Sequence, residues 1–349
     1  EVHMAQTRTM RQNYLDMSKG IAPDFLLQYT YGPNPYSKRA QLATGIGPSF
    51  LRSRRVDGAG YDIWGVKYVA NREAGFAGLP EPGNFILDDI TKWRDVVKAP
   101  DISDIDWEKM AKKDLEDMAA MGVDATQTAL GYNLHVGYFQ ELMALMGFVE
   151  GLCAIQEEPE EVMALWDYMC SFYEEVAKKS FKYYNADFYQ LTDDTAAWGA
   201  PFISPKQYKE LLKPFHAREA QIGLDSGLPI AMHCCGKCEA FVDDWMDFGV
   251  RYWDPPQTCN DLLAIQKKWG NKLILTGCFD VLGEMLSPSY GEERFKQDVR
   301  DCIDKYSREA LFIFDHWVFG DPDNELFNER NRWMTEVVED YGLHVYGNN

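Results

Sequence analysis

Positive charge is scarce in this sequence. Its 349 residues contain 35 lysines and arginines against 55 aspartates and glutamates, so the formal net charge is −20. Contacts to phosphate groups need clustered basic side chains, and this deficit therefore argues against nucleic acid or an anionic membrane surface as a partner. Long apolar runs are missing too. None approaches the roughly 18 residues that indicate a membrane span, so we expect no span.

The sequence also shows no internal repeat, no low-complexity segment and no secretory signal. Its first four residues, Glu1 to Met4, form neither the basic n-region nor the apolar h-region of such a signal. Hydrophobic residues make up 46% of the chain, which is ample material for a large core. These features together predict a cytoplasmic protein with a well-packed interior.

The chain does not need disulfide bonds to be stable. It has eight cysteines, but a chain of this length can bury a core without covalent cross-links. Three of the eight, Cys234, Cys235 and Cys238, fall within five residues. Such clustering is typical of metal-ligand chemistry rather than of stapling. We therefore expect reduced thiols and a cytoplasmic enzyme.

Short apolar segments alternate with helical segments along most of the chain. The short segments are apolar on both faces, which is typical of parallel strands covered on both sides of a sheet, and the alternation indicates an α/β fold. Eight strands in a chain of this length predict a (β/α)8 TIM barrel. The predicted strands are 24–29, 61–68, 126–132, 187–192, 228–233, 250–253, 272–276 and 311–314.

The region before residue 107 departs from this regular pattern. It is rich in aromatic residues, Gly and Pro, and a Pro/Asp-rich excursion with a short helix near 93–97 runs from Leu79 to Trp107. We interpret it as an N-terminal extension and insertion, about residues 1–107, of a single TIM-barrel domain that spans residues 1–349.

Polar and reactive side chains gather where the predicted strands end. In a parallel α/β barrel, the carboxyl ends of the strands form the face that carries catalytic residues. Strand ends also lead into polar loops in any fold, and that alternative explains the aspartates well but the cysteines poorly. The residues concerned are Asp193, Asp194, His233, Cys234, Cys235, Asp254, residues 278–280, Asp315 and His316.

The sharpest of these signals is His233-Cys234-Cys235-Gly236. Residues two apart on a strand point the same way, so His233 and Cys235 can share one metal while Cys234 faces the other side. Imidazole and thiolate are a zinc-type pair, and a catalytic zinc usually takes three protein ligands. We expect Cys278 as the third ligand, with Asp315 and His316 as competitors. The alternative is that these cysteines are buried small hydrophobic residues.

Three further residues are candidates for acid–base chemistry, and several aromatic residues are candidates for substrate binding. Asp193 and Asp194 could act as general acid or base, or could simply cap the helix that follows. His316 is the third candidate catalytic residue. Tyr132, Trp198 and Trp317 could form an aromatic wall for a flat substrate, although ordinary core use explains most aromatic residues in a chain with 14% of them.

A set of short segments carries a resemblance to a known family. They are 62–66, 87–91, 158–162, Thr192-Asp193-Asp194, Ile203-Ser204-Pro205 with Tyr208 and Pro214-Phe215, His233-x-Cys235-Gly236, Gly249-Val250 and Leu275-Thr276-Gly277. Each is short, but in their order and spacing the chain resembles the uroporphyrinogen decarboxylase superfamily. The resemblance is densest from Gly131 to Trp317 and covers most of the chain.

The resemblance implies one of two main activities. Decarboxylases of the superfamily work without a metal and share an Arg-rich N-terminal stretch that grips propionates, a pattern that the segment 52–55 does not match. Methyltransferases share a His-x-Cys zinc motif on the fifth strand, and His233 and Cys235 fall on it. Their third ligand is usually a Cys at the end of the eighth strand, where this chain has Asp315 and His316. The methyltransferase branch is therefore favoured.

For that branch the resemblance implies zinc in the protein and a corrinoid (cobalamin) cofactor supplied by a partner corrinoid protein. The methyl group would move between this corrinoid and a small-molecule donor or acceptor, and the aromatic-rich sequence leans towards an aryl methyl ether, as in an O-demethylase. Zinc would act as a Lewis acid on the ether oxygen. Two alternatives are a metal-free decarboxylase, which would tolerate loss of His233, and a non-catalytic binding protein on the same barrel.

Overall fold

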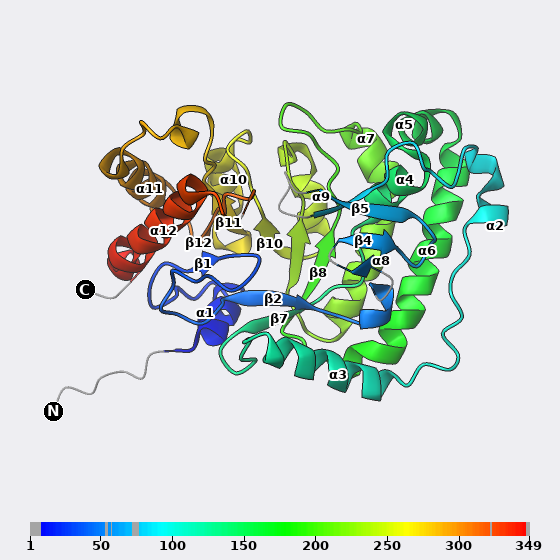
Figure 1. Cartoon of the computed structure of the whole chain (residues 1–349), viewed down its shortest axis with the longest axis horizontal. Helices are drawn as coiled ribbons and strands as arrows, with labels where there is room; N and C mark the ends of the chain where they lie inside the picture. The colour runs from blue at the N-terminus through cyan, green and yellow to red at the C-terminus, as the bar shows by residue number, and fades with distance from the viewer. Residues whose placement is uncertain (1–7, 53–54, 57, 72–76, 322, 347–349) are drawn as a thin grey trace.

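Eight parallel strands curl into a nearly closed barrel that helices surround (Figure 1). The computed structural model describes residues 8–52, 55–56, 58–71, 77–321 and 323–346. The strand order is β1-β12-β11-β10-β9-β8-β7-β2. The strands are β1 (Gln28–Tyr29), β2 (Ala43–Ile46), β7 (Ala129–Tyr132), β8 (Phe188–Thr192), β9 (Ile230–His233), β10 (Val250–Asp254), β11 (Ile274–Cys278) and β12 (Phe312–Asp315). The predicted (β/α)8 barrel is confirmed.

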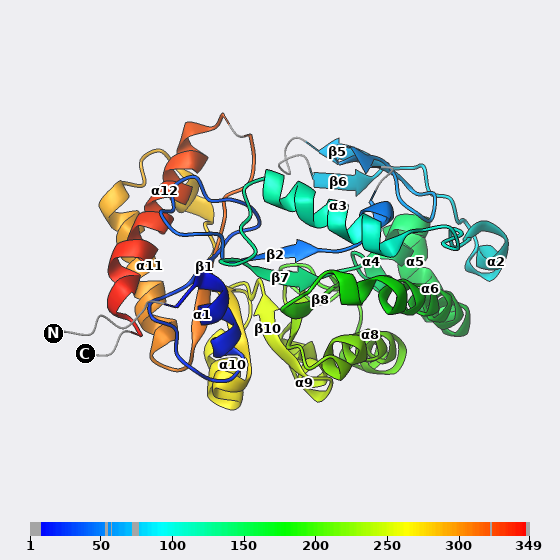
Figure 2. The ribbon, with the colours of Figure 1, turned by 90° about the horizontal axis from the view of Figure 1, so that it is seen from below.

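Helices cover the outside of the barrel. Helices α10 to α12 gather at one end of the molecule and α4 to α6 and α8 at the other, with the strands between them (Figures 1 and 2). The helices are α1 (Met10–Met17), α2 (Trp93–Val96), α3 (Trp107–Ala120), α4 (Tyr138–Met146), α5 (Phe148–Glu157), α6 (Pro159–Ser180), α7 (Pro205–Gln207), α8 (Lys213–Asp225), α9 (Val242–Asp247), α10 (Leu262–Trp269), α11 (Glu292–Ser307) and α12 (Glu325–Asp340).

The longest of these helices, α6, shows why the sequence folds as it does. Pro159 takes the first helical position, where its fixed φ fits and its missing N–H costs nothing. Glu160 and Glu161 follow in the first turn and two lysines stand in the last turn, so the charges complement the helix dipole at both ends. On α6, the ring of Phe172 lies 5.4 Å from that of Trp64, and the hydroxyl of Ser180 contacts that of Tyr132 on strand β7.

Helix α1 closes the amino end of the barrel. Its Tyr14 ring stacks on Tyr252 with 4.4 Å between the ring centroids and lies 5.2 Å from the ring of Phe188. One residue from or beside each strand joins this inner core: Leu27, Ala43, Ala129, Phe188, Ala231, Tyr252, Ile274 and Ile313. The amino end is therefore filled with apolar side chains, and the polar interior positions lie at the carboxyl end.

The expected second barrel strand at 61–68 is wrong, because the second strand is β2 at Ala43–Ile46. Residues 61–68 instead join two antiparallel strands of a separate four-stranded sheet. The carboxylate of Asp62 accepts the backbone N–H groups of Trp64 and Val66, and Gly65 takes a φ of +92°, so the chain turns there. This sheet consists of β3 (Arg55–Val56), β4 (Ala59–Tyr61), β5 (Lys67–Asn71) and β6 (Ala77–Pro80).

The short helix expected near 93–97 is confirmed as α2. Ser204 caps α7 with a full capping box. Among the described residues, no single helix is long and apolar enough to cross a membrane. Helices α4 and α5 pass that test only as a pair, and they bend by 115° at Gly147.

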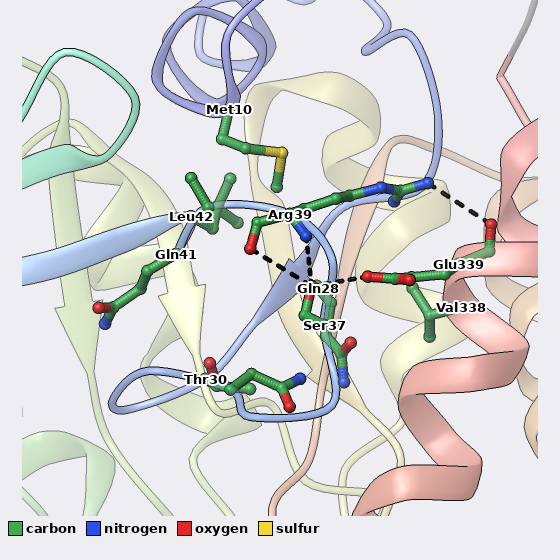
Figure 3. A pocket seen from close by; sticks show the side chains of 11 residues that line it. Met10, Gln28, Thr30, Ser37, Arg39, Gln41, Leu42, Val338 and Glu339 are labelled. Atoms are coloured by element: carbon green, nitrogen blue, oxygen red, sulfur yellow. Dashed lines mark hydrogen bonds between the residues drawn. The ribbon is translucent and has the colours of Figure 1, made fainter. Parts of the chain in front are cut away.

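Between β1 and β2, the two ends of the strand order, the connecting segment contacts α12 through side chains. The carboxylate of Glu339 on α12 accepts the Ser37 hydroxyl (2.6 Å) and the backbone N–H of Lys38 (2.9 Å). The Arg39 guanidinium lies over the Phe25 ring and reaches the carbonyl oxygen of Glu339. Figure 3 shows the contacts of Ser37 and Arg39 with Glu339 beside a cavity of about 20 Å³. The segment between the two strands is thus fastened to α12.

Candidate metal centre

His233 ends strand β9, and Cys235 follows it on the same face. The Nε2 atom of His233 lies 3.8 Å from Sγ of Cys235. Cys234 points to the opposite face, where its Sγ lies 3.2 Å from Sγ of Cys238 and 3.4 Å from the Thr195 hydroxyl. The alternation expected from the strand period is therefore present around this motif.

A third group completes the cluster, and it comes from the end of the neighbouring strand β8. One ligand atom each from Asp194, His233 and Cys235 lie within 4.8 Å of one another. Asp194 Oδ1 accepts the backbone N–H of Cys235 at 2.7 Å and lies 3.9 Å from His233 Nε2. An imidazole nitrogen, a sulfur and a carboxylate oxygen are all donors that zinc takes, so the donor set fits this metal.

Asp254, at the end of β10, holds the imidazole of His233 from behind. Its Oδ2 lies 2.8 Å from His233 Nδ1, which leaves Nε2 free to face Cys235 and Asp194. Burial disfavours the charged ring, but the charge and hydrogen bond of Asp254 outweigh it and raise the pKa of His233 well above its ordinary value. A carboxylate behind a ligating histidine is the usual way to fix its ring and tautomer.

The thiol of Cys235 is protonated without a metal. Burial raises its pKa to about 11, although the nearby His233 partly opposes this shift. Metal ligands must be deprotonated, so a metal ion bound here would displace a proton from Cys235 and one from His233.

The structure does not bring Cys278, the expected third ligand, to this cluster. Cys278 ends β11 with a φ of +72°, so its side chain leaves the alternation of the strand. It lies in the buried core beside α11, where the Cys302 thiol donates to its carbonyl oxygen at 3.3 Å. Burial and the neighbouring Cys302 raise the pKa of its thiol well above the ordinary value.

The two competitors on the last strand also lie outside the cluster. Asp315 is 3% exposed, and burial together with the charge of Asp254 raises its pKa well above the ordinary range. The Nε2 atom of His316 accepts the backbone N–H of Val281 at 3.3 Å, and burial lowers the pKa of its ring. His316 is thus engaged with the backbone rather than with the other candidate catalytic residues.

The two aspartates after β8 have different surroundings. Asp193 is fully buried and accepts the backbone N–H groups of Phe139 (3.0 Å) and Gln140 (3.1 Å). Its other neighbour is the imidazole of His216, whose Nε2 lies 3.1 Å away. Asp193 therefore holds the start of α4, a helix that precedes it in the sequence, whereas Asp194 faces the cluster.

The three expected aromatic residues are dispersed. Tyr132 is fully buried beneath α6, where its hydroxyl lies 2.6 Å from that of Ser180, so it lines no cleft at the barrel mouth. Trp198 is 44% exposed, in a loop whose Ala197 carbonyl accepts the backbone N–H of Lys237 just after the His-x-Cys motif. Trp317 follows β12 and lines a cavity at the barrel mouth.

Sequence reasoning missed two aromatic residues at that cavity. The Tyr31 ring lies 5.9 Å from the His233 ring, and its hydroxyl lies 3.4 Å from His233 Nδ1. Phe319 packs 5.7 Å from Tyr31. With Trp317 they line a cavity of about 280 Å³. Tyr31 follows the first strand, and that position at a strand end is the signal that could have found it.

Comparisons with known proteins identify the family and support the fold. A family model described as "Uroporphyrinogen decarboxylase (URO-D)" matches residues 136–316, just over half of the chain. No curated protein matches the sequence significantly. A solved methyltransferase from Methanosarcina mazei shares the fold, with a TM-score of 0.65 and 12% identity over 96% of this chain and 99% of that chain. An alpha-fucosidase from Thermotoga maritima, solved with fucose, overlaps weakly, with a TM-score of 0.27 and 13% identity over 98% and 59%.

Proposed function

The chain belongs to the uroporphyrinogen decarboxylase (URO-D) family, and on this premise we propose that it is a zinc-dependent methyltransferase. It would move a methyl group between a small donor, such as an aryl methyl ether, and a corrinoid protein. The observation that carries the proposal is the cluster of Asp194, His233 and Cys235 at the carboxyl end of the barrel. Decarboxylation in this family needs no such ligand set, as the resemblance above implies.

The ligand set that we propose differs from the expected one. His233 and Cys235 would hold zinc together with Asp194 in place of Cys278, because the Asp194 carboxylate lies beside both and the Cys278 thiol does not. Bound zinc would supply Lewis acidity towards the heteroatom of the methyl donor or acceptor. Asp254 would keep His233 Nε2 directed into the cluster.

The aromatic cavity beside His233 would receive the small substrate. Tyr31, Trp317 and Phe319 offer apolar ring surface next to the cluster, and such surface excludes water from a bound methyl donor. The same M. mazei structure that shares this fold is a methyltransferase by name, and we carry that activity over to this chain as part of the proposal.

The corrinoid would come from a partner protein in the cytoplasm. A formal charge of −20 favours docking of a partner with a basic surface, because complementary charge speeds encounter and fixes orientation. This expectation predicts that the transfer rate falls as the salt concentration rises.

The first experiment is metal analysis of the purified protein and four variants. We expect about one zinc per chain in the wild type, strong loss in His233→Ala, Cys235→Ser and Asp194→Asn, and full retention in Cys278→Ser. Zinc lost from Cys278→Ser but kept by Asp194→Asn would restore Cys278 as the ligand. A wild type that takes up no zinc after loading would overturn the metal-dependent function.

The second experiment tests methyl transfer itself. The zinc-loaded protein is mixed with a reduced corrinoid protein and a panel of methoxylated aromatics and methylamines, and the corrinoid absorbance spectrum reports methylation. Turnover that disappears in Asp194→Asn supports the proposal. Decarboxylation of a tetrapyrrole that survives His233→Ala would favour the metal-free alternative instead, and binding without any turnover would favour a non-catalytic role.

A further inference from the structure

The backbone on both sides of Cys235 is held by side chains. The Cys235 N–H donates to Oδ1 of Asp194 at 2.7 Å. The N–H of the next residue, Gly236, donates to Oε1 of Gln257, also at 2.7 Å. Each peptide group is planar, so holding the groups before and after Cys235 fixes its φ and ψ and hence the direction of its Cα–Cβ bond.

Gln257 differs from Asp194 in that it stands outside the candidate ligand set. It lies in the loop after β10, whereas the clustered ligand atoms belong to Asp194, His233 and Cys235. Its hydrogen bond goes to the backbone N–H of Gly236 instead. An effect of Gln257 on a bound metal would therefore pass through the turn that follows Cys235.

The amide of Gln257 is oriented by Asp280, which follows β11. Its Nε2 donates to Oδ1 of Asp280 at 3.2 Å. Oδ2 of Asp280 accepts the N–H and the hydroxyl of Thr258, each at 2.7 Å. The Gly236 N–H needs an acceptor and the Asp280 carboxylate needs a donor. A glutamine amide provides both, whereas an ionised glutamate side chain would provide acceptors only.

Asn260 holds the same turn one peptide group further on. Its Nδ2 donates to the carbonyl oxygen of Gly236 at 2.9 Å, and its Oδ1 accepts the N–H of Glu239 at 2.9 Å. The Asn260 side chain is buried, so these bonds are shielded from water. Gly236 is therefore bound at both its N–H and its carbonyl group, and the turn after Cys235 has a fixed shape.

We propose that Gln257 is a positioning residue that directs the Cys235 thiolate into the metal cluster, and that Asp280 orients its amide for this task. The inference rests on the proposed zinc site. A ligand that its surroundings hold in place binds a metal without first having to be ordered, so losing the hold lowers metal affinity.

The test reverses the polarity of the contact between positions 257 and 280. Gln257→Glu brings two carboxylates together and Asp280→Asn brings two amides together, so each single variant should bind zinc about tenfold or more weakly in a chelator competition. In the double variant the new amide donates to the new carboxylate, which still accepts the Gly236 N–H, and the net charge equals that of the wild type. We expect it to recover most of the lost affinity, whereas two independent losses would add.

A further variant gives a spectroscopic readout that a purely structural role would not move. Gln257→Leu removes the acceptor, and cobalt(II) replaces zinc as the probe, because charge transfer from a bound thiolate to cobalt absorbs in the near ultraviolet. Cys235→Ser shows which part of this absorption comes from Cys235. At saturating cobalt we expect a weaker Cys235 band in Gln257→Leu and a full band in Gln221→Leu. Gln221, exposed on α8, is the matched control.

The inference fails alone if the wild type binds zinc and Gln257→Leu keeps both the affinity and the cobalt band, or if the losses of the two single variants add in the double variant. A wild type that binds no zinc overturns the proposed function and this inference with it. If Gln257→Leu does not fold, the comparison of the single variants with the double variant still decides.

Discussion

Asp254 Oδ2 lies 2.8 Å from Nδ1 of His233, on the side of the ring away from Cys235 and Asp194. The contact joins the ends of two neighbouring strands, since Asp254 and His233 are register partners of β10 and β9. One hydrogen bond therefore fixes which nitrogen of the imidazole is offered to a metal.

The Asp254→Asn substitution should weaken zinc without displacing the ring. The amide oxygen of Asn can still accept from Nδ1, but the negative charge that strengthens His233 as a ligand is lost. We expect zinc affinity to fall by about 10- to 100-fold, measured by competition with a chromophoric chelator. Asp247→Asn, whose side chain is 67% exposed, is the control. Unchanged affinity in Asp254→Asn would contradict this role.

Zinc uptake should release protons. The pKa of His233 is raised well above 6.5 by Asp254 despite burial, and burial raises the pKa of Cys235 to about 11, so both groups hold a proton at pH 7 in the metal-free protein. Because protons compete with the metal, affinity should rise with pH. Calorimetry in two buffers of different ionisation enthalpy should give about two protons per zinc at pH 7. Release of none would show that the ligands are already deprotonated.

Stability on the acid side should depend on Glu219. Burial raises the pKa of this carboxyl, but the charge and hydrogen bond of His135 outweigh it, so the folded pKa is lowered. A lowered folded pKa contributes stability above the unfolded value of about 4.5 and loses it as the pH falls, at most about 1.4 kcal/mol per pH unit. In urea unfolding measured from pH 6 to pH 3, the free energy of unfolding of Glu219→Gln should fall less steeply with pH than that of the wild type.

The control for that measurement is Glu175→Gln, on the exposed side of α6, where the side chain is 56% exposed. The pH dependence of its free energy of unfolding should match that of the wild type. Glu219→Gln should also be less stable at neutral pH by about 3–5 kcal/mol, because His135 loses its buried partner. If the free energy of unfolding depended on pH equally in the wild type and in Glu219→Gln, folding would not lower the pKa of Glu219.

Gly236 should not tolerate a side chain, for a reason that Gly227 does not share. Both have a left-handed φ, +86° and +74°, so an Ala at either place pays about 1–2 kcal/mol of strain. Only at Gly236 would a Cβ lie 2.6 Å from the carbonyl oxygen of Ala196. We expect Gly236→Ala to lose an additional 1–3 kcal/mol, roughly the cost of overpacking, and to bind less zinc. Gly227→Ala should keep its zinc.

Much of the barrel could be read from the sequence because its later strands are apolar on both faces. The second strand was missed since Ala43-Thr44-Gly45-Ile46 is short, contains Gly and runs into Gly47 and Pro48. Residues 61–68 look like a strand by composition, but the turn at Asp62 divides them. The assignment of residues 1–349 to a single domain stays a prediction.

The candidate site could be read only in part. Strand alternation places His233 and Cys235 together, because that relation is local. Which third side chain reaches them depends on how neighbouring strands end, and Asp194 reaches them through the adjacent strand β8. The positive φ at Cys278 is invisible in the sequence, since a residue other than Gly or Asn gives no sign of it.

Among the described residues, no backbone ladder joins β1 and β2, the two ends of the strand order. Every other neighbouring pair in the strand order is joined by backbone hydrogen bonds, whereas Ser37 and Arg39, in the connection from β1 to β2, are held by Glu339 of α12. Separating β1 from β2 breaks no backbone hydrogen bonds between them. The amide protons of these two strands should therefore exchange with heavy water before those of β9 and β10. We therefore expect the barrel to open first between β1 and β2.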